Sequence, residues 1–115
     1  MPRLLLALLL GLAAVPAQGA GTVPPEAERL LWCGNAFYWL AADASDAADE
    51  KQAEQFQGWS DQLLDRAATL LAATGLDATA TDDLIETYAD RALEEMASPA
   101  APYDVTTLCP VLVTP

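Results

Sequence analysis

The feature that most limits how this chain can fold is its single pair of cysteines, Cys33 and Cys109, which stand far apart in a short sequence. In an exported protein, two cysteines are expected to form one disulfide. Closing so long a loop stabilises a fold by about 4–5 kcal/mol, which is comparable with the whole stability of a small domain. The alternative, a reactive thiol pair, lacks support because the chain has no C-x-x-C motif, no histidine and few basic residues.

The N-terminal segment has the layout of a secretory signal peptide. A short basic start is followed by an apolar run over residues 4–15 and then by small residues. We expect residues 1–19 to be the signal, with cleavage after Ala17 or Gly19, and residues 20–115 to form a single helical domain. The apolar run is too short to span a bilayer comfortably, so no stable membrane insertion is expected. These features predict a periplasmic or secreted protein.

The chain is strongly acidic, with 17 Asp and Glu against 5 Lys and Arg, a net charge of −12. Such a charge repels nucleic acid and anionic lipid headgroups, so nucleic acid is excluded as a partner. A solvated acidic surface is the simplest interpretation of this charge. If the surface binds a protein, a basic partner is favoured electrostatically.

The first helix is expected over residues 25–43, because Pro25 suits the first helical position and acidic residues follow it. At helical spacing its apolar face carries Leu30, Cys33, Phe37 and Leu40. Another face carries Trp32, Asn35 and Trp39 beside acidic residues, so we expect both tryptophans to lie at least partly at the surface. Tryptophan beside polar residues is typical of interfaces, and these three residues are the predicted partner-binding surface. The alternative is that neighbouring helices cover this face and the rings are core.

The second helix is expected over residues 47–73, with Ser45 or Asp46 as its N-cap and Gly75 just beyond its end. A glycine inside it, Gly58, would allow a kink or a split into two helices. The residues expected to face the core are Phe56, Ser60, Leu63, Ala67, Leu70 and Thr74.

The third helix is expected to begin at an N-cap, Thr81, and to end before Pro99. The apolar tail that follows contains Cys109 and has room for one further helical turn. The sequence therefore predicts an all-α fold, a small three- to four-helix bundle with a C-terminal tail tied to the first helix by the disulfide.

The sequence lacks the motifs of the common catalytic and cofactor-binding sites. Histidine is absent, no serine lies in a G-x-S-x-G elbow, and no glycine-rich phosphate loop occurs. The segment "DATATDD", residues 77–83, has alternating oxygen-bearing side chains but lacks the glycine and glutamate of a calcium loop. We therefore expect no enzyme activity, no catalytic residue, no cofactor and no metal.

Two family resemblances follow from where the cysteines stand. A cysteine in an aromatic-rich first helix, "LWCGNAFYWLA", and a second near the end, "YDVTTLCPVL", resemble small exported helical proteins of proteobacteria. That resemblance implies an all-helical envelope protein and carries no site residues. The chain is also similar to the periplasmic acid-stress chaperones of the HdeA type, which are small, exported and helical with one disulfide.

Two functions are compatible with these features. The first is a non-catalytic envelope protein that acts as an interaction module or accessory subunit and binds another envelope protein, possibly a basic one. The alternative is an acid-stress chaperone, which loosens when its carboxylates are protonated and then exposes apolar surface. Neither hypothesis fixes an oligomeric state.

Overall fold

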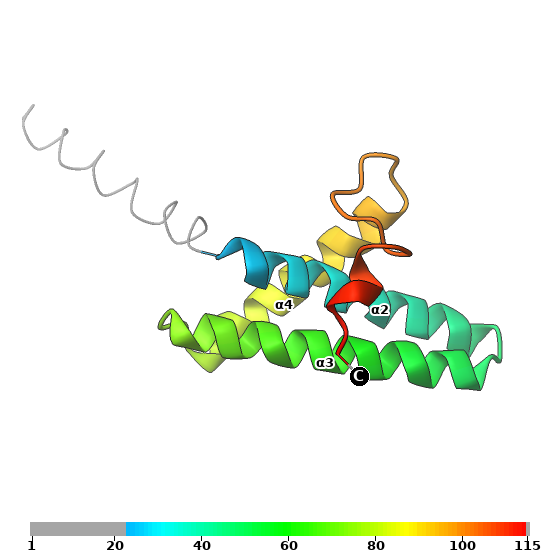
Figure 1. Cartoon of the computed structure of the whole chain (residues 1–115), viewed down its shortest axis with the longest axis horizontal. Coiled ribbons are helices and arrows are strands. Elements are labelled where there is room, and N and C mark those ends of the chain that lie inside the picture. The colour runs from blue at the N-terminus through cyan, green and yellow to red at the C-terminus, as the bar shows by residue number, and fades with distance from the viewer. Residues whose placement is uncertain (1–22, 115) are drawn as a thin grey trace, which may run out of the picture.

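The computed structural model describes residues 23–114, and within them the chain is all-helical (Figure 1). Three α-helices, α2 (Pro25–Asp46), α3 (Glu50–Ala73) and α4 (Ala78–Met96), are followed by a short 3-10 helix, η1 (Cys109–Leu112). The expected signal segment and its cleavage sites, Ala17 and Gly19, lie outside the described residues. The predicted all-α class and the disulfide are confirmed.

Helices α2 and α3 form an antiparallel hairpin and share the larger part of the core (Figure 1). Gly34 in α2 makes their close approach possible, because a Cβ atom there would lie 2.8 Å from Cδ2 of Leu64. Helix α2 runs to Asp46, three residues further than expected, so the prediction of Ser45 or Asp46 as the next N-cap is wrong. The cap is Asp49, whose side chain accepts a hydrogen bond from the backbone N–H of Gln52 at 3.2 Å.

Helix α3 continues through Gly58 as one unbroken helix, so the kink or split that this glycine allows does not occur. Leu63 is fully buried, as predicted, whereas Leu70 is only partly buried at the edge of the core. The helix ends where the glycine predicts: Gly75 has a φ of +97°, a left-handed conformation that side chains other than glycine rarely adopt.

Helix α4 crosses the hairpin and contacts α2 far more than α3 (Figure 1). It begins one turn earlier than expected, with Asp77 as N-cap accepting from the backbone N–H of Ala80 at 2.8 Å. The prediction of Thr81 as N-cap is therefore wrong: Thr81 lies inside the helix and is buried. Residues 78–83 are the first turns of a helix, which leaves no calcium-type loop there.

The C-terminal segment is tied to both helices of the hairpin. The Cys33–Cys109 disulfide joins it to α2, with a Cα–Cα distance of 5.4 Å, and both cysteines are fully buried. Gln62 of α3 exchanges hydrogen bonds with the backbone of Thr114, and the Arg66 guanidinium donates to the carbonyl of Leu112. The tail thus packs as part of the domain, and its end lies beside α3 (Figure 1).

Candidate functional site

Trp32, Asn35 and Trp39 lie along one stripe of α2 and all point toward α4. Each donates a side-chain N–H to an acceptor on that helix. Trp32 donates to the carboxylate of Glu95, Asn35 to the backbone carbonyl of Ile85, and Trp39 to the backbone carbonyl of Ala89. The stripe that the sequence predicts as a surface is therefore largely the contact between two helices. Because a side-chain N–H of each residue finds an acceptor on α4, large rings beside polar residues can be accommodated there.

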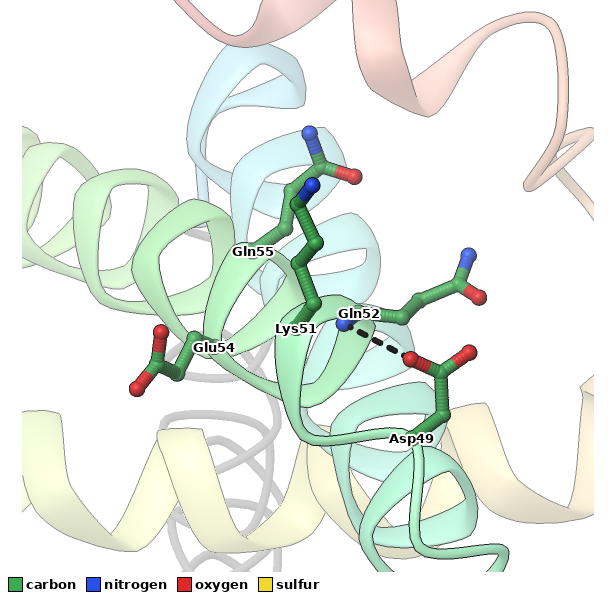
Figure 2. A pocket seen from close by; sticks show the side chains of 5 residues that line it. All are labelled: Asp49, Lys51, Gln52, Glu54 and Gln55. Atoms are coloured by element: carbon green, nitrogen blue, oxygen red, sulfur yellow. Dashed lines mark hydrogen bonds between the residues drawn. The ribbon is translucent and has the colours of Figure 1, made fainter.

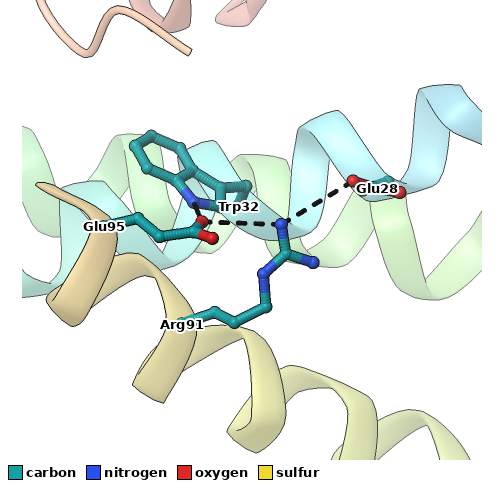
Figure 3. Close-up of polar contacts among 4 residues, drawn as sticks. All are labelled: Glu28, Trp32, Arg91 and Glu95. Atoms are coloured by element: carbon teal, nitrogen blue, oxygen red, sulfur yellow. Dashed lines mark hydrogen bonds and ion pairs between the residues drawn. The ribbon is translucent and has the colours of Figure 1, made fainter. Parts of the chain in front are cut away.

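The expectation that Trp32 lies at the surface is wrong, because its side chain is 0% exposed. The indole N–H donates to Oε1 of Glu95 at 2.7 Å (Figure 3). The ring also packs against Tyr103, with a centroid distance of 5.5 Å. Helix α4 and the C-terminal segment together cover the side of α2 on which the helical wheel also places charged residues. Trp32 is thus a core residue that joins three parts of the chain.

The charged residues beside Trp32 pair with one another at the edge of the same contact. Arg91 lies 3.5 Å from Glu95 and 3.9 Å from Glu28, all about one-third exposed, so these ion pairs contribute modestly (Figure 3). Partial burial is the largest single influence on the Arg91 pKa and lowers it, but the charge and hydrogen bond of Glu95, together with Tyr88 and Glu28, outweigh it, and the net shift is upward. Burial, and next the negative charge of Glu28, raises the pKa of Tyr88, over whose ring Arg91 lies at 4.7 Å.

Asn35 is 2% exposed, and both hydrogens of its amide are used. Nδ2 donates to the carbonyl of Leu31 at 2.8 Å and to that of Ile85 at 3.2 Å. Trp39 is half-buried, as expected, and its indole N–H donates to the carbonyl of Ala89 at 2.8 Å. These two side chains hold α4 in register against α2 while keeping one side open.

That open side is a surface pocket of about 450 Å³ where α2, α3 and α4 meet. Its walls are Asn35, Tyr38, Trp39, Leu64, Ile85, Glu86, Ala89 and Asp90. Two of the three residues predicted to bind a partner therefore line one pocket, and Trp32 does not. Tyr38 is 45% exposed and lies edge-on to Trp39, with a centroid distance of 5.1 Å.

Sequence reasoning missed Tyr38, Ile85, Glu86 and Asp90 as members of this site. Tyr38 carries a signal of its own, because it is an aromatic residue next to Trp39 that lies outside the apolar stripe of its helix. The α4 residues carry no such signal in the sequence. Their spacing predicts which of them share a face of α4, but it does not predict which face of α2 that face contacts.

A second hollow at the start of α3 differs from this pocket in chemistry. Its lining residues, Asp49, Lys51, Gln52, Glu54 and Gln55, are all exposed, and their side chains spread outward in different directions (Figure 2). The interaction drawn among them is the N-cap hydrogen bond of Asp49. Polar side chains that do not converge form no binding arrangement, so the α2–α4 pocket is the candidate functional site.

Within residues 23–114, no three His, Cys, Asp or Glu side chains gather so as to hold a metal ion. None of the described helices is both long and apolar enough to cross a bilayer. Comparison with protein-family models, with curated proteins and with solved structures found nothing that matches this chain.

Proposed function

We propose that this chain is a non-catalytic exported envelope protein that acts by binding another protein through the pocket between α2 and α4. The observation that carries the proposal is the pocket itself, an apolar and aromatic hollow with exposed Tyr38 at its edge. Ligand sites in proteins are mostly apolar concavities with a few well-placed polar groups, which is the composition of this one. The Cys33–Cys109 disulfide fits an oxidising, exported location.

The absence of histidine from the sequence and the exposure of most carboxylates support a binding role over a catalytic one. The disulfide and the tail contacts hold α2 in place, so the pocket is presented on a supported scaffold. Binding to a pre-formed surface loses less conformational entropy than binding to a mobile one.

Site-specific photo-crosslinking in the native envelope tests the proposal. A photoreactive phenylalanine analogue replaces Tyr38 in one variant and Val111, which is 76% exposed on η1, in the control. We expect one protein to crosslink from position 38 and not from position 111, and to bind the purified mature chain at a fixed stoichiometry. Equal crosslinking from both positions, or none from position 38, would contradict the proposal.

The acid-stress chaperone is the second candidate, and the contact between Trp32 and Glu95 favours it. The fully buried side chain of Trp32 donates to a carboxylate, so a contact between α2 and α4 relies on an acidic side chain. Circular dichroism and binding of the dye ANS between pH 7 and pH 3 separate the two candidates. A chaperone of this kind loses tertiary structure and binds the dye at low pH, whereas a rigid interaction module does neither.

A further inference from the structure

The polar groups of the α2–α4 pocket are those that recognise a cation. Glu86 and Asp90 stand one turn apart on α4, and neither forms an ion pair with any described residue. The lining includes two aromatic rings, Tyr38 and Trp39, and no lysine or arginine. A chain of net charge −12 adds a negative potential around the site. An anionic ligand is therefore disfavoured, and a positively charged group is favoured.

Asn35 adds a hydrogen-bond acceptor to the wall of the pocket. It is 2% exposed and lines the pocket, and both of its amide hydrogens are used on helix carbonyls. Among the described residues no donor bonds to its Oδ1, and this oxygen is not one of the fully buried atoms, so it can accept a hydrogen bond from outside the chain. A ligand that brings an N–H group can donate to this oxygen.

The apolar walls indicate that the cation is carried on an aliphatic stem. Leu64, Ile85 and Ala89 lie beside the aromatic rings, so a methylene chain packs there while its charged head reaches the carboxylates. Tyr38 and Trp39 also attract a cation placed over their faces. A volume of about 450 Å³ holds a long side chain with part of its backbone and is too small for a whole helix.

We infer that this pocket binds an arginine or lysine side chain on a basic segment of the partner protein. The inference rests on the proposed function and adds the chemistry of the partner. Arginine fits best, because its planar group can donate to a carboxylate and to Asn35 Oδ1 at once and can stack on a ring.

Titrations followed by two-dimensional NMR of the 15N-labelled mature, oxidised protein test the inference. The probe is an acetylated and amidated hexapeptide of alternating leucine and arginine, and its matched control carries citrulline, a neutral isostere, at each arginine. We expect the arginine peptide to shift the amide and indole signals of Asn35, Tyr38 and Trp39. The citrulline peptide should bind at least about tenfold more weakly, since it lacks the charge that Glu86 and Asp90 recognise.

Two double variants separate the pocket from general electrostatic attraction. Glu86→Gln/Asp90→Asn removes both pocket carboxylates, and Asp61→Asn/Asp65→Asn removes two exposed acids at the same spacing on α3 that do not line the pocket. We expect the first to weaken binding of the arginine peptide about fivefold or more and the second to change it less than twofold.

The outcomes are distinguishable from those of the proposed function. Equal losses in both double variants, or equal affinity for the citrulline peptide, would overturn the inference. Binding of arginine methylamide as tight as that of the hexapeptide would also overturn it, because the pocket would then take a small cation. If neither peptide binds the pocket while position 38 still crosslinks to one envelope protein, this inference is wrong and the proposed function stands without it.

Discussion

Replacing Trp32 distinguishes most sharply between a core role and a surface role for the tryptophan stripe. Its side chain is 0% exposed, donates to Glu95 at 2.7 Å and packs on Tyr103. Truncating a buried tryptophan to alanine costs about 3–5 kcal/mol through lost burial and the cavity left behind. The hydrogen bond adds an amount near the lower end of its usual range, about 1.5 kcal/mol, because the Glu95 side chain is 31% exposed and regains water.

Such a loss approaches the whole stability of a small domain, so Trp32→Ala is expected to be largely unfolded. Trp32→Phe is the quantitative variant, because it keeps an apolar ring and removes the indole N–H. We expect it to lower the free energy of unfolding by about 2 kcal/mol. Urea denaturation followed by circular dichroism measures this change, which should lower the midpoint by about 1 M.

Tyr38→Ala is the matched control, since Tyr38 is an aromatic residue of the same helix that is 45% exposed. Its effect should stay within about 0.5 kcal/mol, as for ordinary surface substitutions. A double-mutant cycle then links the tryptophan to its acceptor: Glu95→Gln should cost less in the Trp32→Phe background than alone. A Trp32→Phe effect below about 0.5 kcal/mol would refute the burial argument and restore the surface interpretation of the stripe.

Three further predictions concern the disulfide, the α2–α3 contact and the C-terminal turn. Reducing the disulfide, whose cysteines are 76 positions apart, should destabilise the domain by about 4–5 kcal/mol, and an unchanged melting temperature would contradict this. Gly34→Ala should cost about 1–3 kcal/mol in urea denaturation, because the added Cβ meets Leu64; no loss would mean that this side chain moves freely. Hydrogen bonds from Thr106, side chain first and then backbone, hold the Asp104 pKa below its usual value near 3.8. Ionised Asp104 should therefore make the protein more stable than the Asp104→Asn variant above that pH, and this difference in stability should vanish as the pH falls below it. Melting temperatures of both proteins between pH 2.5 and 7 measure the difference. A difference that stays constant over this range would refute the prediction.

Much of the architecture follows from the sequence because it depends on local chemistry. Proline at the start of α2 and glycine after α3 act through backbone dihedral preferences, which neighbouring elements rarely override. With two cysteines there is one possible intramolecular pairing, and the structure contains it. Leu63 is buried because a leucine in the middle of an apolar helical stripe has few other places to lie.

The N-cap residues of α3 and α4 could not be predicted, because the sequence offers more than one residue suited to each position. Asp49 and Asp77 cap α3 and α4, although Asp46 and Thr81 are also residues that favour the position. The choice depends on where the preceding helix stops and on how many turns pack against the core. Because α4 begins one turn earlier than predicted, Thr81 lies within the helix, and its side chain is buried.

Only the tertiary structure determined the burial of Trp32, Asn35 and Trp39. A helical wheel gives the angle between side chains, but it does not say which sides of a helix other elements will cover. The acidic residues on that side of α2 indicated an exposed face. In the structure, Glu28 lies at the edge of the helix contact, where it is partly exposed and pairs with Arg91, whereas Trp32 is fully buried. The pocket arises from the same cause: it exists only because α4 crosses α2 at the turns that carry Asn35 and Trp39, and no local pattern encodes where two helices cross.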